Sequence, residues 1–120
     1  KKQMKTIAIK RIYDEPSDND GYRILVDRLW PRGVSKIIAN LDEWNKEVAP
    51  STELRKWFDH KEARFDEFSK LYREELISKE KELDSLREIA KMKTVSLLYG
   101  AKDPKINHAI ILRNVLLKRL

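Results

Sequence analysis

The sequence contains no cysteine and only three glycines among its 120 residues. The absence of cysteine excludes a disulfide framework, a cysteine zinc site and a thiol nucleophile, and it favours a reducing, cytoplasmic location. The scattered glycines cannot form the fingerprints that cradle a dinucleotide or a nucleoside triphosphate, and no nucleophile elbow occurs. Two histidines among scattered carboxylates have no recognisable metal-ligand spacing. We therefore expect neither a cofactor nor a metal.

Long apolar runs are also absent, because no segment approaches the ~20 apolar residues that cross a bilayer. The N-terminal stretch "KKQMKTIAIK" is basic, but it lacks the apolar segment and the small-residue cleavage site of a signal peptide. We therefore expect no membrane partner.

Charged residues are abundant: they make up 38% of the chain, and the formal net charge is +6. This excess favours anionic partners such as nucleotides, phosphorylated metabolites or nucleic acid. Acids and bases alternate throughout, however, without a run of five or more like charges. The length and the lack of repeats or linkers predict a single domain over residues 1–120, with residues 1–5 flexible. The oligomeric state stays open.

Apolar periodicity divides the chain into alternating strands and helices. Strands are predicted at residues 6–12, 22–29 and 94–99, with a weaker short strand within 41–48. Helical patterns follow Ser35 and Ser51, which we predict to be N-caps, and then cover residues 61–77, 79–91 and 108–120. Asp103 before Pro104 is an alternative start of the last helix. This alternation predicts an α/β fold whose sheet is at least partly parallel.

Polar side chains follow two of these strands, at the position where α/β sheets bind ligands. The first group is Asp27, Arg28, Trp30 and Arg32. The second is Lys102, Asp103, Asn107 and His108, after Gly100. If the two strands are neighbours, the two groups share one crevice.

The first group has two interpretations. Pro31 and Gly33 hold Arg32 on a stiff turn, and its planar guanidinium suits phosphate or carboxylate. Arg55, one turn into a helix, could point toward the same anion. Alternatively, the arginines form a buried network with Asp27, and Trp30 fills a core position.

Candidate roles follow from these residue types. Arg28, Trp30, Arg32, Arg55 and Lys102 are candidate ligand-binding residues. Asp27, Asp103 and His108 are candidate proton-transfer groups, because that role needs a carboxylate or imidazole within hydrogen-bond reach of the reacting atom.

Three long strings carry a family resemblance: "YDEPSDNDGYRILVDRLWPRGVSK", "LDEWNKEVAPSTELRKWFDH" and "LLYGAKDPKINHAIIL". Together they resemble the YeaO-like family, classed as domain of unknown function 488, from about Ile9 to Leu117. Longer relatives of this kind have Cys-His-Arg at the start of the last helix, where this chain has Asn107-His108-Ala109. The resemblance therefore implies no role that depends on that cysteine or arginine, whereas His108 is retained.

The fold expectation is accordingly a small three-layer, Rossmann-like α/β domain with a mostly parallel sheet of about four strands flanked by helices. Three functions stay open. The first is binding of, or action on, a small anionic, phosphate-bearing ligand at the carboxyl ends of the strands. The second is a nucleic-acid-associated module, and the third is a non-catalytic structural or interaction domain. Whether the chain is an enzyme is not decided by its sequence.

Overall fold

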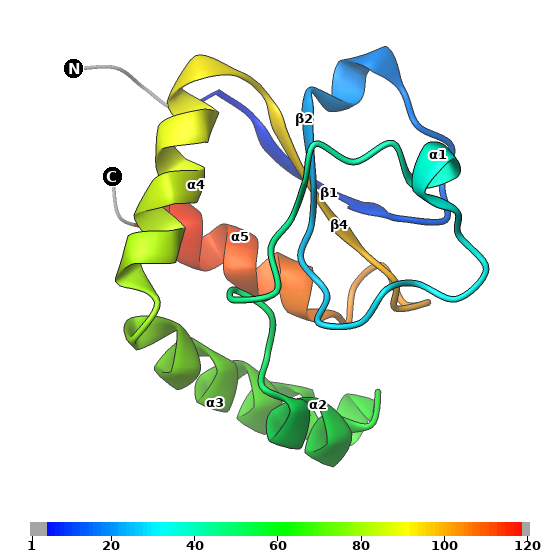
Figure 1. Ribbon diagram of the computed structural model, residues 1–120. Helices are drawn as coiled ribbons and strands as arrows, with labels where there is room; N and C mark the ends of the chain where they lie inside the picture. The colour runs from blue at the N-terminus through cyan, green and yellow to red at the C-terminus, as the bar shows by residue number, and fades with distance from the viewer. Residues whose placement is uncertain (1–4, 119–120) are drawn as a thin grey trace.

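A four-stranded sheet, with its strands in the order β1-β4-β2-β3, forms the centre of the computed structural model (Figure 1). All strand pairs are parallel. The structure describes residues 5–118. Residues 1–4, which belong to the stretch expected to be flexible, lie outside that range. The strands are β1 (Ile7–Arg11), β2 (Tyr22–Leu25), β3 (Glu43–Trp44) and β4 (Val95–Tyr99).

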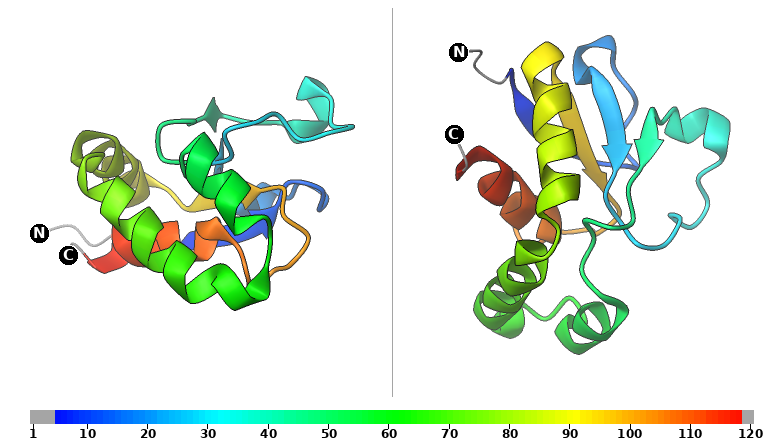
Figure 2. Two further views of the ribbon diagram at one scale, coloured as in Figure 1. Left: turned by 90° about the horizontal axis from the view of Figure 1, so that it is seen from below. Right: turned by 60° about the vertical axis from the view of Figure 1, so that its left-hand side comes forward.

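Helices lie on both sides of the sheet and complete the predicted three-layer α/β arrangement (Figure 2). One layer contains α2 (Thr52–Phe58), α3 (Phe65–Ile77), α4 (Glu80–Met92) and α5 (His108–Lys118). The other layer is thin and contains α1 (Lys36–Ala39) with its flanking loops. Short 3₁₀ turns, η1 (Asp18–Asp20) and η2 (Glu62–Arg64), precede β2 and α3. None of the helices within residues 5–118 is long and apolar enough to span a membrane.

The alternation of side chains along each strand produces two apolar clusters. Ile24 and Leu97 face the helical layer, where they belong to the main core with Phe68, Tyr72 and Leu112. The next residues along the two strands point to the other face, where a smaller cluster contains Ile12, Leu25, Ala39 and Leu98. Because β2 and β4 are covered on both faces, the chain at the end of each has a continuous apolar run, Ile24-Leu25-Val26 and Leu97-Leu98-Tyr99, rather than an alternation.

One strand boundary differs from the sequence expectations, and the structure decides between the two predicted starts of the last helix. The second strand ends at Leu25 rather than Leu29, because its neighbour β3 pairs only as far as Leu25 and the chain then turns away. The last helix begins at His108, so the alternative start at Asp103 is wrong. Asn107 accepts the Ile110 N–H in the first turn, whereas the Asp103 carboxylate accepts the N–H groups of Lys105 and Ile106 in the preceding loop.

Candidate functional site

The two polar segments meet at the carboxyl edge of the sheet, because β2 and β4 are hydrogen-bonded neighbours. The Gly100 N–H, directly after β4, donates over 2.8 Å to Oδ2 of Asp27, which follows β2 and Val26. A Cβ at position 100 would lie 3.0 Å from the same oxygen, so glycine permits this close approach. The two loops therefore meet at one edge of the sheet, and the expectation that they line a common crevice stays a prediction.

His108 approaches Asp27 from the start of α5. Its Nε2 lies 3.2 Å from Oδ1 of Asp27 and 2.9 Å from the carbonyl oxygen of Val26. The carbonyl is the better-aligned partner, and Oδ1 has no hydrogen bond within the described residues. Since both neighbouring oxygens are acceptors, Nε2 carries a proton.

Tyr72 holds the His108 ring from the core side. The two ring centroids are 6.0 Å apart in an edge-to-face arrangement. The Tyr72 hydroxyl donates to the carbonyl oxygen of Val48. Burial raises the pKa of this hydroxyl well above its usual value, so it remains a donor. The imidazole orientation is thus fixed, while the side chains of Asp27 and His108 keep 20% and 14% of their surface exposed.

Arg28 points away from this pair, toward the loop before α2. Its Nε donates to the carbonyl oxygen of Pro50 over 2.9 Å, and its Nη2 donates to that of Ala49 over 3.2 Å. Within residues 5–118, no carboxylate forms an ion pair with this guanidinium, and no acceptor contacts Nη1. The predicted buried network between Asp27 and an arginine is therefore not what holds Arg28: backbone carbonyls do.

A cavity of about 180 Å³ lies beside Arg28. Its walls are formed by Arg28, Glu47, Ala49, Ser51, Glu75, Leu76, Ser78 and Lys79. Glu75 accepts both the backbone N–H and the hydroxyl of Ser51. Lys79 contacts Glu47 over 2.9 Å, and this hydrogen bond lowers the pKa of the Glu47 carboxyl. Lys79, Glu47 and Glu75 are therefore already engaged. Arg28 forms no direct ion pair within the described residues, although its charge also lowers the pKa of the Glu47 carboxyl.

Trp30 and Arg32 have different environments on the same turn. The Trp30 indole donates to the Val34 carbonyl oxygen and packs edge-on against Trp44, with centroids 5.2 Å apart, in the thin layer. Arg32 is exposed, and its carbonyl oxygen accepts the Tyr13 hydroxyl. Gly33 has a φ of 79°, as the turn requires. The interpretation of Trp30 as a core residue therefore gains support, and Arg32 is available to solvent.

The remaining candidates stand apart from the Asp27–His108 pair. Arg55 is half-buried in α2, and its buried Nε has no partner within the described residues. Lys102 and Asp103 are exposed in the loop between β4 and α5. Asp103 is occupied by the backbone N–H groups of its own loop. Asp27, Arg28 and His108 therefore lie at the same edge of the sheet. The eight candidate residues as a whole do not converge on one pocket.

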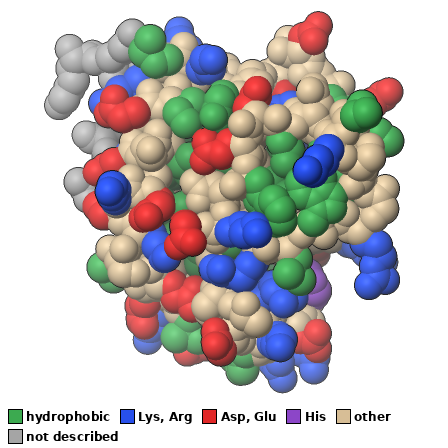
Figure 3. All heavy atoms as spheres, viewed as in Figure 1, with side chains coloured by type: hydrophobic (Ala, Val, Ile, Leu, Met, Phe, Trp, Pro, Cys, Tyr) green, Lys and Arg blue, Asp and Glu red, His purple; other side chains and the backbone are tan. Residues whose placement is uncertain are grey.

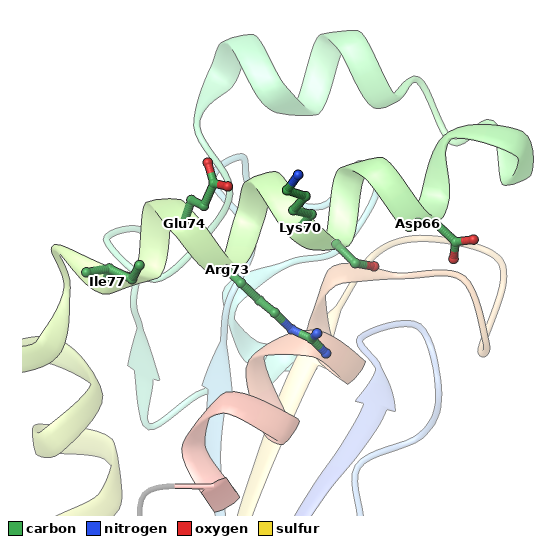
Figure 4. Close-up of a pocket in the computed structure, with 6 residues that line it drawn as sticks. Asp66, Lys70, Arg73, Glu74 and Ile77 are labelled. Atoms are coloured by element: carbon green, nitrogen blue, oxygen red, sulfur yellow. The ribbon is translucent and has the colours of Figure 1, made fainter.

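A second, larger hollow of about 600 Å³ lies along the outer side of α3. It is lined by Asp66, Ser69, Lys70, Arg73, Glu74 and Ile77, all from one helix. In the close-up, Lys70 and Arg73 extend to opposite sides of the helix rather than toward a common point (Figure 4). This surface therefore does not assemble a site. No group of three His, Asp or Glu side chains in residues 5–118 is placed to hold a metal ion.

Several groups that form contacts at the carboxyl edge of the sheet could not be predicted from the sequence. The carbonyl oxygens of Ala49 and Pro50 belong to the backbone, which residue identity does not reveal. Tyr72 is recognisable as a core residue from its helical stripe, but its hydroxyl contact is not. The pairing of Ser51 with Glu75 spans two helices that only the fold brings together.

Comparison with known proteins gives consistent matches over nearly the whole chain. A family model described as "Inactive DUF488-N3 subclade" matches residues 6–120. The uncharacterized protein YeaO of Escherichia coli (strain K12) is 50% identical over 106 residues, which cover 88% of this chain and 92% of that protein. Uncharacterized proteins of Mycobacterium bovis and Mycobacterium tuberculosis are each 37% identical over 110 residues, or 92% of either chain. No solved structure matches significantly.

Proposed function

Since this chain belongs to the YeaO-like DUF488 family, we propose that it is a non-catalytic domain that binds a small anionic, phosphate-bearing ligand beside Arg28. The observation that carries the proposal is the set of contacts made by the Arg28 guanidinium. This guanidinium is held by two carbonyl oxygens, has no carboxylate within ion-pair distance in residues 5–118, and lines a cavity of about 180 Å³. A fixed guanidinium with a free edge is well suited to a phosphate oxygen.

Within residues 5–118, the arrangement of the candidate nucleophiles supports binding rather than catalysis. The chain has no cysteine, and the Ser51 hydroxyl is held by Glu75 and by the Leu54 N–H that it caps. His108 lies next to Asp27 but directs its Nε2 proton to Val26. The matching family model is itself described as inactive. The missing cysteine also agrees with a cytoplasmic location, which we include in the proposal.

A thermal-shift titration with inorganic phosphate and a panel of nucleotides and sugar phosphates tests the proposal. A ligand that binds only the folded state raises the free energy of unfolding by about 2.7 kcal/mol at 100 times its Kd, so the melting temperature should rise. Arg28→Lys should reduce the shift, because a lysine cannot present the same fork of donors. The matched control, Lys105→Ala in an exposed loop, should retain it.

A second variant separates loss of binding from loss of folding. Ser78→Phe places a bulky ring at the wall of the cavity and leaves Arg28 itself unchanged, so it should abolish the ligand shift. Its unliganded melting temperature shows how much the loss of the Ser78 hydroxyl bond to the Glu75 carbonyl oxygen destabilises the fold. The absence of a shift with every compound would overturn the proposal. Binding to oligonucleotides that falls steeply with added salt would instead favour the nucleic-acid module.

A further inference from the structure

Large apolar side chains are exposed on the thin layer of the sheet. Leu29 has 59% of its surface exposed, Ile37 89% and Ile38 62%. Figure 3 shows apolar side chains gathered over the part of this face where α1 and its flanking loops lie in Figure 1. Single exposed apolar residues are ordinary, but a grouped set on one face is typical of an interaction surface.

The covering beneath these side chains is sparse. The opposite sheet face packs against α2 to α5, whereas this face has one four-residue helix and the loops around it. Trp30 and Trp44 therefore remain only partly buried over the smaller cluster. A partner placed here would extend an apolar layer that the chain itself does not complete.

Charges of both signs border the same surface. Lys36 begins α1 and Arg32 lies in the turn before it, and neither forms an ion pair with a carboxylate within residues 5–118. Three exposed acids, Asp14, Glu15 and Asp18, occupy the loop before β2 and have no cationic partner in the same range.

Two contacts hold this acidic loop against the α1 segment. The Tyr13 hydroxyl donates to the Arg32 carbonyl oxygen over 3.0 Å. At the other end of the loop, Arg23 contacts Asp20 and also donates to the carbonyl oxygens of Ala39 and Asn40. The unpaired acids and cations are therefore fixed parts of one rim.

We propose that this α1 face, defined by Leu29, Ile37 and Ile38 with the rim residues Asp14, Glu15, Asp18, Arg32 and Lys36, is the interface of a symmetric homodimer. A two-fold axis brings the same patch of both copies together. If residue i of one copy contacts residue j of the other, residue j of the first copy then contacts residue i of the second. The rim cations of each copy then pair with the rim acids of its partner around an apolar centre. This inference does not depend on the proposed ligand site.

The rim composition disfavours other occupants. A membrane surface or a nucleic acid is broadly anionic, and the exposed acids Asp14, Glu15 and Asp18 would be repelled by it. A second copy carries the matching charges of both signs.

Sedimentation equilibrium over a wide concentration range tests the dimer. The wild-type chain should pass from monomer to dimer mass. Ile37→Glu and Ile38→Glu should each weaken dimerisation by ~10-fold or more, because they place a charge in the apolar centre. The matched control is Ile77→Glu on α3, which changes a residue that is 77% exposed outside this face. A monomer at every concentration, or an equal effect of the control, would overturn the proposal.

A mixing experiment tests the charge pairing. One variant has its cations reversed (Arg32→Glu and Lys36→Glu), and the other has its acids reversed (Asp14→Lys, Glu15→Lys and Asp18→Lys). Each rim then carries one sign, so each variant alone should be monomeric, and an equimolar mixture should form a heterodimer. Dimers of either variant alone, or a mixture that stays monomeric, would contradict the two-fold arrangement. Far-ultraviolet circular dichroism of each variant checks that it is folded.

Discussion

At the scale of single residues, two glycines with positive φ are constrained by different features. Gly21 has a φ of 67°, and a Cβ there would lie 2.2 Å from the Thr94 carbonyl oxygen. Gly33 has a φ of 79°, but a Cβ would meet nothing within 4 Å. Gly33 is therefore required for its conformation alone, whereas Gly21 is also required for a close approach of two backbone segments.

Alanine substitutions should separate these two requirements. Gly33→Ala should cost about 1–2 kcal/mol of unfolding free energy, the usual cost of left-handed backbone for an L-residue. Gly21→Ala should cost that plus a further ~1–3 kcal/mol, because the backbone must move to relieve the overlap. Urea denaturation of both variants measures the difference. Equal losses would show that the contact with Thr94 relaxes freely.

The candidate site was predictable in position but not in detail. Asp27, Arg28 and His108 could be placed at one edge, because polar residues after parallel strands gather there. The direction of each side chain could not be predicted. Arg28 is oriented by the carbonyl oxygens of Ala49 and Pro50, and these come from a loop whose path depends on the whole fold.

At the scale of secondary-structure elements, the start of α2 is held by two linked contacts. The Ser51 hydroxyl accepts the Leu54 N–H, which confirms its predicted role as the N-cap. The same residue is bound through its N–H and hydroxyl by the Glu75 carboxylate of α3. Glu75 of α3 thereby links the N-cap of α2 to the packing of α2 against α3.

Ser51→Ala should destabilise the protein by more than an isolated cap does. Loss of a cap costs about 1 kcal/mol, and loss of a hydrogen bond to a charged group adds about 1.5–3 kcal/mol. Glu75→Gln removes the charge while keeping an acceptor, so its effect should be smaller. The double variant should lose less than the sum of the single losses, because both changes remove the same contact. Strict additivity in urea denaturation would contradict this coupling.

Element boundaries were predictable where a local signal exists. Ser35 and Ser51 begin α1 and α2 as expected, because an N-cap satisfies backbone donors within the same turn. The end of β2 was not predictable, because it depends on the two-residue neighbour β3. At α5, Asp103 offered a competing local signal, and the chain uses Asn107 instead.

At the scale of the whole molecule, the order of the strands in the sheet could not be predicted from the sequence, because it depends on the tertiary structure. β4 lies between β1 and β2, so it pairs with segments more than seventy residues away in the sequence. The apolar sequence of a strand does not indicate which other strands it pairs with. A charged network at the opposite edge of the sheet from the site stabilises this arrangement. Asp20 accepts hydrogen bonds from Lys10 of β1, from Arg23 of β2 and from the Ser17 backbone. Its own carbonyl oxygen accepts the Ser96 hydroxyl of β4.

This network should make the stability of the whole domain sensitive to acid. Burial by itself would raise the pKa of Asp20, but the hydrogen bonds from Ser17, Lys10 and Arg23 outweigh it and lower the pKa. A carboxyl whose pKa is lowered on folding stabilises the protein above its unfolded pKa of about 3.9, and this contribution disappears as pH falls through the folded value. Removal of one partner from a buried pair costs about 3–5 kcal/mol, so Asp20→Ala should be strongly destabilised at neutral pH.

The substitution Asp20→Asn removes the charge of the Asp20 carboxylate but keeps a side chain of similar size, so it separates the effect of the charge from the effect of losing the side chain. Urea denaturation between neutral pH and acid should show a free-energy difference between wild type and Asp20→Asn that is largest at neutral pH. The difference should shrink below about pH 4, because protonation then removes the same charge from the wild-type chain. The matched control is Asp18→Asn, an exposed neighbour without an ion-pair partner in residues 5–118, which should leave the pH dependence unchanged. A wild-type to Asp20→Asn difference that is constant with pH would show that the Asp20 charge does not stabilise the arrangement of β1, β2 and β4.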